Sequence, residues 1–278
     1  MTDTSKDLGS LTEPIKRLTR DLRQASRLLS VAEARYLVDA YYQMQRDRIR
    51  AAHQRRTLAL AEEPNEVVDW LEANTGVLER NIKSALGAFR QASPVGRWAE
   101  SICGVGPVIS AGLLAQINIE KAPTVGHIWR FAGLDPTVVW AKGQKRPWNG
   151  ALKRLCWIIG ESFVKVQAHD EDVYGKLYAA RKVIEEAKNA AGAFREQAER
   201  SLATKRWRDE TTTRAAYEAG RLPQARLHLR AERWAVKIFL SHWQHVAYFH
   251  RFRVHPPKPY VLAQLGHAHE IQVPHWPF

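Results

Sequence analysis

The stretch that decides the fold reads Trp98-Ala-Glu-Ser-Ile-Cys-Gly-Val-Gly-Pro-Val-Ile-Ser-Ala-Gly-Leu-Leu-Ala-Gln-Ile117. It predicts a short helix, a Gly-Val-Gly bend and a second helix rich in small residues. Gly104 and Gly106 permit a tight turn and expose backbone amides, and Pro107 suits the first turn of the following helix. Val105 is expected to fill the space between the two helices, which the small residues of the second helix allow to approach closely.

This arrangement resembles the helix-hairpin-helix family. The amides of the bend and the positive end of the second helix could face a phosphate. Such contacts position a nucleic-acid backbone but read no bases, so the bend predicts binding without sequence preference. A glycine turn retained only for packing is the alternative interpretation.

Three stretches downstream extend the pattern: Trp129–Pro136, which ends in Gly-Leu-Asp-Pro, the basic loop Trp140–Asn149, and the helix Leu152–Ser162, which begins Leu-Lys-Arg. In this order they look like the C-terminal domain of the IS one-ten (also called IS one-sixteen) family of insertion-sequence transposases. The later run Ala219–Leu240 is similar to the helix that closes that domain. The resemblance covers roughly residues 95–170 and 217–250, and it implies a DNA-binding protein of mobile-element descent that serves DNA recombination.

Two departures from the family bear on chemistry. Members carry an RNase-H-like domain with metal-binding acidic residues ahead of this one, whereas the first 97 residues here predict helices without strands. Members also place a serine, implicated as the nucleophile, just before a glycine of the basic loop, where this chain has Lys142-Gly143. Strand transfer needs a hydroxyl nucleophile or clustered carboxylates with metal. We therefore expect DNA binding without catalysis, and no catalytic residue is assigned.

Cations and tryptophans alternate in and after the basic loop, where an unpaired base could stack on an indole face. A further basic strip is expected on the helix that carries Arg226, Arg230 and Arg233. An ordinary solvated loop, and ion pairs between these arginines and residues 171–214, are the competing interpretations. The candidate nucleic-acid-binding residues are Gly104, Val105, Gly106, Pro107, Lys142, Gly143, Lys145, Arg146, Trp148, Asn149, Lys153, Arg154, Arg226 and Arg230.

The charge balance points to a polyanionic partner. The 278 residues include 42 Lys and Arg against 29 Asp and Glu, a net charge of +13, and the pI is about 9.9. Residues 205–258 hold 12 of the basic and only 4 of the acidic residues. Such clustering favours phosphate binding with counterion release, although composition does not separate DNA from structured RNA.

Helical periodicity over nearly the whole chain predicts an all-α fold. A helix over residues 12–57, started by Thr12, Glu13 and Pro14, and a second after Pro64 form a helical hairpin that could mediate a homodimer. We expect four segments: this hairpin (1–93), a helix-hairpin-helix DNA-binding domain (94–170), a projecting helical arm broken near Ala191-Gly192 (171–216), and an aromatic closing helix over 223–252 with a loop-rich tail (217–278).

Other site classes find little support in the sequence. Cys103 and Cys156 form no CxxC pair, and His242 and His245 lack the spacing of a metallohydrolase helix, so no metal or cofactor is expected. The polar N-terminus and the lack of a long apolar run predict a cytoplasmic protein without a membrane span. Two alternatives to a non-catalytic DNA-binding protein stay open: a transposase subunit whose catalytic half is a separate chain, and a helical protein that binds an acidic protein.

Overall fold

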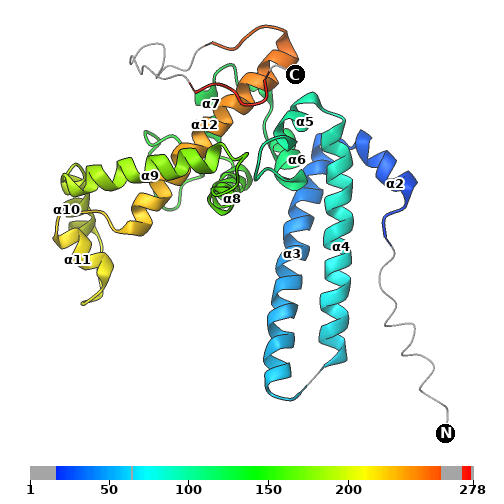
Figure 1. Cartoon of the computed structure of the whole chain (residues 1–278), viewed down its shortest axis with the longest axis horizontal. Helices are drawn as coiled ribbons and strands as arrows, with labels where there is room; N and C mark the ends of the chain where they lie inside the picture. The colour runs from blue at the N-terminus through cyan, green and yellow to red at the C-terminus, as the bar shows by residue number, and fades with distance from the viewer. Residues whose placement is uncertain (1–16, 64, 258–270, 277–278) are drawn as a thin grey trace. The chain divides into compact units, whose positions relative to one another are not determined.

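The chain folds into helices and connecting loops, as the sequence predicts. The computed structural model describes residues 17–63, 65–257 and 271–276, and all regular secondary structure within them is helical (Figure 1). The all-α prediction is therefore confirmed. None of the helices in these ranges combines the length and the apolar character that a membrane span requires.

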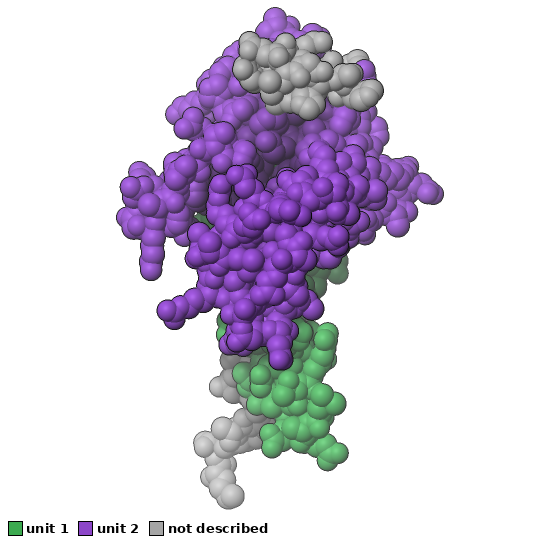
Figure 2. Space-filling view, turned by 90° about the vertical axis from the view of Figure 1, so that its left-hand side faces the viewer, with its two compact units in different colours: residues 1–97, 106–116 green, residues 98–105, 117–278 purple. Residues whose placement is uncertain are grey.

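The chain divides into two compact units (Figure 2). Unit 1 comprises residues 1–97 and 106–116, and unit 2 comprises residues 98–105 and 117–278. The division differs from the four expected segments, because α6 (Pro107–Gln116) packs with the N-terminal hairpin instead of forming a separate central domain with the residues that follow it. It also falls inside the Gly-Val-Gly bend: Gly104 and Val105 belong to unit 2, whereas Gly106 belongs to unit 1.

Unit 1 is built on the helical hairpin of α3 (Val31–Leu60) and α4 (Glu66–Gln91). Asn65 caps α4 by accepting hydrogen bonds from the amides of Val67 and Val68, which explains why the helix starts directly after the Pro64 region. A buried cluster joins the hairpin to α6 through Val38, Tyr41, Leu86, Val108 and Ala111. The predicted hairpin is therefore present, and α6 packs against both of its helices.

The expected continuous helix over 12–57 is wrong, because the chain breaks before residue 31. The short α2 (Arg20–Ala25) and the 3-10 turn η2 (Ser26–Leu28) precede α3. Ser30 and Glu33 form a capping box: the Ser30 hydroxyl accepts from the Glu33 amide at 3.2 Å, and the Ser30 amide donates to the Glu33 carboxylate at 2.7 Å. The cap starts a new helix where apolar periodicity alone predicts continuity. The expected start at Thr12, Glu13 and Pro14 lies outside the described residues.

Unit 2 is organised around α12 (Gln224–Phe252), in close agreement with the predicted helix over 223–252. Its Phe239 lies in an aromatic core with Trp98, Phe163 of α8 (Gly150–Val166) and Tyr174 of α9 (Tyr174–Ala190). All four rings are almost completely buried. Burial of this much aromatic surface fixes α8 and α9 against α12.

The expected projecting arm is only partly correct. Gly192 (φ +80°) ends the first arm helix at the predicted break. However, α9 packs along α12 instead of projecting, with Tyr178 buried beside Ala231 and Ala235. Asp172, the last residue of an acidic run that begins at Asp170, caps this helix, because its carboxylate accepts from the amides of Gly175 and Lys176.

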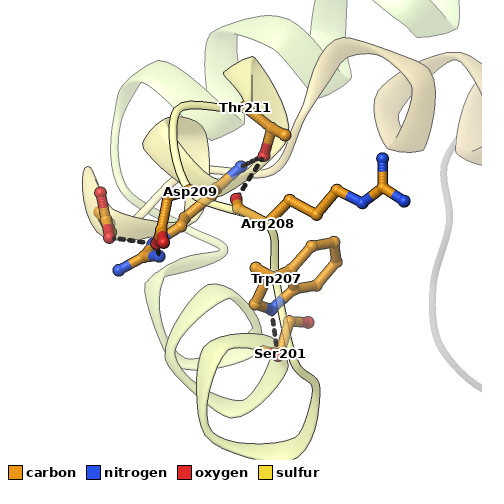
Figure 3. A network of polar contacts seen from close by, with 7 residues as sticks. Ser201, Trp207, Arg208, Asp209 and Thr211 are labelled. Atoms are coloured by element: carbon orange, nitrogen blue, oxygen red, sulfur yellow. Dashed lines mark hydrogen bonds and ion pairs between the residues drawn. The ribbon is translucent and has the colours of Figure 1, made fainter.

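The rest of the arm is a small helical pair, α10 (Arg195–Thr204) and α11 (Thr212–Glu218), which pack on each other. In the loop between them the Trp207 indole donates to the Ser201 carbonyl at 3.1 Å, and the Thr211 hydroxyl donates to the Arg208 carbonyl (Figure 3). The side chain of Arg208 extends away from this network (Figure 3). Hydrogen bonds from side chains to backbone carbonyls therefore hold the loop, and Arg208 is exposed.

Candidate nucleic-acid interface

The unit 2 part of the Gly-Val-Gly bend is held by backbone geometry and by α8. Gly104 has φ +87°, a conformation that favours glycine, and its carbonyl accepts a 2.6 Å hydrogen bond from the Ser162 hydroxyl. The Val105 side chain is buried, as expected for a residue that fills the space between helices. Its amide donates to the Ile102 carbonyl at 2.9 Å. One of the bend's amides is therefore already paired inside the protein.

The charges near this half of the bend are mainly negative. The pKa of the Cys103 thiol is raised by burial and then by the carboxylates of Asp172 and Glu171, with Lys176 acting in the opposite direction. Cys103 directly precedes Gly104, so the field of these carboxylates extends to the bend. The electrostatics of this half therefore disfavour a phosphate.

The unit 1 half of the bend is more open. Gly106 is exposed, and a Cβ atom added to it would meet no atom within 4 Å. Pro107 begins α6 as predicted, and the Gly106 carbonyl accepts from the Ser110 amide in the first turn. This half leaves room for a ligand. The dipole of α6 is not sufficient by itself to make it a binding site.

The predicted basic loop is exposed and carries no helix. Lys142, Lys145 and Arg146 are all exposed, and Gly143 adopts φ +91° with open space around it. The loop is closed by the Trp140 indole, which donates to the Gln144 carbonyl at 2.8 Å. The Arg146 guanidinium lies 5.9 Å from the centre of the Trp140 ring. The loop therefore presents cations on a backbone with a defined turn.

The start of α8 places a second cation on an indole face. The Lys153 ammonium lies 4.1 Å from the centre of the Trp148 ring. Gly133 (φ +66°) makes room for this pair, because a Cβ atom there would lie 2.9 Å from Trp148 Cγ and 3.1 Å from Lys153 Cδ. Asn149 caps α8 by accepting from the Leu152 amide, so its side chain has a structural role.

The loop, α8 and α12 bring their cations together. The pKa of Lys153 is lowered by burial and then by the charges of Arg233 and Arg146. The pKa of Arg233 is lowered by burial and then by Arg230 and Arg226. We name as the basic surface the side chains of Trp140, Arg146, Trp148, Lys153, Arg226 and Arg233. Its cations repel one another, and a bound anion would relieve that repulsion.

Two predicted residues on the neighbouring helices have different surroundings. Arg230 donates to the buried Glu185 carboxylate at 2.7 Å, an ion pair that Arg181 shares. The competing interpretation, an ion pair with the arm, therefore applies to Arg230. Arg154, the residue after Lys153 in α8, is exposed.

The structure adds Lys237 to the basic strip on which the sequence already places Arg233. Lys237 lies with its ammonium 4.2 Å from the centre of the Trp129 ring, and the Trp129 indole donates to the Lys237 carbonyl at 3.2 Å. Arg233 and Lys237 are four residues apart on α12 and so share a face. Their spacing from Arg226 was visible in the sequence, but the indole that holds Lys237 comes from α7 (Val125–Phe131), about a hundred residues away.

Comparisons with known proteins identify no relative. No known protein family matches the chain, no curated protein is detectably similar to it, and no solved structure matches its fold.

Proposed function

We propose that this chain is a non-catalytic DNA-binding protein of transposase descent. It binds the phosphate backbone through the basic surface of unit 2. The observation that carries the proposal is the clustering of Arg146 and Arg233 around Lys153: burial lowers the Lys153 pKa, and the charges of Arg233 and Arg146 lower it further. Clustered cations of this kind offer several phosphate contacts at once.

The tryptophans make the cluster a better ligand site than a flexible basic loop. Lys153 and Arg146 lie over the Trp148 and Trp140 rings, so part of their side-chain freedom is already lost before a ligand arrives. Trp140 is 36% exposed, which leaves indole surface for an unpaired base. Duplex or branched DNA is the proposed ligand, of which only the branched form offers unpaired bases, and structured RNA shares the phosphate chemistry.

The bend contributes less to binding in this proposal. The carboxylates of Asp172 and Glu171 act on Cys103, the neighbour of Gly104, and the amide of Val105 is paired. Only the open position at Gly106 fits the expected phosphate contact.

The same proposal includes a homodimer formed through unit 1. The hairpin exposes large apolar side chains, with Tyr36 73% and Val67 71% accessible, and such surface favours association. Light scattering after size exclusion should give twice the chain mass of 31.7 kDa. A single-chain mass for the wild-type protein, unchanged in a Tyr36→Ser variant, would remove the dimer and leave the DNA proposal intact.

The test of DNA binding is a salt titration with a matched control. Fluorescence anisotropy with a labelled duplex should show affinity that falls steeply between about 50 and 200 mM salt. Lys153→Gln should weaken binding and reduce the salt slope by about 1, whereas Lys188→Gln, an exposed lysine of α9, should change neither.

The same titration is made with three other ligands of the same length: branched DNA, single-stranded DNA and RNA. A preference for RNA would mean that RNA, and not DNA, is the ligand. Absence of binding to any nucleic acid at about 50 mM salt, or equal effects of the two lysine variants, would contradict the proposal. A stoichiometric acidic protein that remains after nuclease treatment would favour the interaction-protein alternative.

A further inference from the structure

Three potential metal ligands converge between α8 and α12. Glu161 comes from α8, and His228 and Glu232 lie four residues apart on one face of α12. One ligand atom from each side chain lies within 4.8 Å of the others. His228 Nε2 is 3.5 Å from Glu232 Oε2 and 3.9 Å from Glu161 Oε1. Two donors bound to one tetrahedral ion at 2.0–2.2 Å would be about 3.4 Å apart. His228 Nε2 and Glu232 Oε2 already have about this separation, and Glu161 would have to move closer to them.

The Glu232 carboxylate is buried and incompletely satisfied. The residue is 2% exposed, and within the described structure Oε2 lacks a hydrogen-bond partner. A buried carboxylate oxygen without a partner is costly unless a proton or a cation compensates it. Glu232 is therefore the feature of the cluster that points to a ligand.

α8 makes space for this carboxylate. A Cβ atom at Gly160 would lie 2.2 Å from Glu232 Oε1 and 2.4 Å from its Cγ. Any other residue at position 160 would displace the carboxylate from the cluster. The close approach places the charged group of one helix directly on the backbone of the other.

His228 is oriented by a neighbouring hydroxyl. The Tyr178 hydroxyl lies 2.8 Å from His228 Nδ1, which leaves Nε2 directed at the two carboxylates. Metal-binding histidines commonly make such a contact with the second ring nitrogen, which fixes the tautomer. With Nε2 bound to a cation, Nδ1–H would donate to the Tyr178 oxygen.

We infer that Glu161, His228 and Glu232 bind one divalent first-row transition-metal ion, of the Zn²⁺ or Mn²⁺ class, with Tyr178 as a positioning residue. One imidazole and two carboxylates suit these ions better than Mg²⁺ or Ca²⁺, which prefer all-oxygen ligands. The side chains of His228 and Glu161 are 29% and 33% exposed, which gives the ion a route of entry. Three protein ligands leave a fourth position for water.

The site does not rest on nucleic-acid binding, and it is tested without any nucleic acid. The full-length, tag-free protein is stripped with a chelator and titrated with Zn²⁺ and separately with Mn²⁺, by calorimetry and by metal analysis after gel filtration. Co²⁺ serves as a coloured probe whose visible spectrum reports coordination. We expect one ion per chain, and a melting temperature that rises with metal concentration, because binding stabilises the folded state.

Variants identify the ligands. Glu232→Gln keeps the shape and is expected to weaken metal binding more than about 100-fold, and Tyr178→Phe to weaken it about 10- to 100-fold. The matched control is His255→Gln, because His255 Nδ1 lies 3.1 Å from His245 Nε2 and this second imidazole pair could also bind Zn²⁺. The control should leave the affinity unchanged.

Folding of Glu232→Gln is checked by its melting temperature without metal. That temperature should equal or exceed the wild-type value, since the substitution removes a buried unpaired charge. Failure to retain an ion, equal binding by wild type and Glu232→Gln, or loss of the ion in His255→Gln alone would each overturn the inference.

Discussion

The Gly-Val-Gly bend and the basic surface of unit 2 both carry sequence features typical of phosphate binding, yet the structure gives them different environments. At the bend, the glycine conformation of Gly104 serves packing on α8, and the charges that act on the adjacent Cys103 are mainly those of carboxylates. At the basic surface, Arg146 and Lys153 lie over indole rings, and Lys153 is close to both Arg146 and Arg233. Glycine spacing reports backbone geometry, whereas the surrounding charge decides whether an anion can bind.

The largest expected effect separates the two regions by removing charge. The triple variant Arg146→Gln, Lys153→Gln and Arg233→Gln should bind duplex DNA about 100- to 1000-fold more weakly at low salt, with a salt slope smaller by about 3, because three phosphate contacts are lost. Anisotropy titrations at several salt concentrations measure both quantities.

The matched control carries the same change in net charge elsewhere in unit 2. Lys165→Gln, Lys188→Gln and Arg200→Gln neutralises three exposed cations and should lower the affinity far less. Equal losses in the two triple variants would mean that net charge, and not the basic surface, drives binding.

The next prediction concerns the stability of unit 2, which carries the basic surface. His242 of α12 is buried, and burial lowers its pKa from 6.5 to about 4. Its Nε2–H donates to the Ile271 carbonyl at 2.9 Å, so Nδ1 accepts from the Tyr174 hydroxyl at 2.7 Å. The nearby His245 charge also opposes protonation. The neutral ring is therefore the form that the fold requires.

Because the unfolded chain binds a proton at His242 that the folded chain excludes, stability should fall as the pH drops from about 6.5 to about 4. The loss should reach about 3 kcal/mol. Urea unfolding should be measured in metal-free Glu232→Gln, since burial and Glu161 raise the Glu232 pKa to about 7, and that group titrates with the opposite sign.

His242→Gln in the same background is the control and should flatten the profile. Lysine and arginine stay charged throughout this range, so DNA affinity should not follow the stability loss until the protein unfolds. A profile unchanged by His242→Gln would show that other groups set the acid response.

The sequence predicted the elements better than their contacts. The closing helix over 223–252 and the break at Gly192 were visible because periodicity and glycine are local signals. The break before Val31 was also encoded, by Ser30 and Glu33 three residues apart, but the apolar periodicity that continues across it obscured the signal. Local patterns thus located most helices.

Long-range packing was not predictable in the same way. An ion pair between an α12 arginine and residues 171–214 was foreseen, but nothing local identifies Glu185 and Arg230 as its partners or shows that α6 joins the N-terminal hairpin. The same limit hid the cluster of Glu161, His228 and Glu232. The spacing of His228 and Glu232 on one helix face was a usable signal, but the third ligand comes from another helix.

A smaller effect compares two glycines in left-handed conformations. Gly104→Ala should destabilise the protein by about 2 to 3 kcal/mol, since a Cβ atom would also meet Val166, Ser162 and Phe163 at 3.2–3.4 Å. Gly143→Ala should cost only about 1 kcal/mol, because open space surrounds it. Urea unfolding measures both, and equal costs would mean that the bend is not packed on α8.

The smallest expected effect is the one most informative about the bend. Gly106 is exposed, its φ lies outside the left-handed region, and nothing lies within 4 Å of an added Cβ, so Gly106→Ala should leave stability unchanged within about 0.5 kcal/mol. If the basic surface alone holds DNA, the affinity should change less than about twofold. If the bend's amides contact phosphate, the methyl group would obstruct the approach, and affinity would fall while the fold stays intact. That outcome would mean that the amides of the bend contact DNA in addition to the cations of the basic surface.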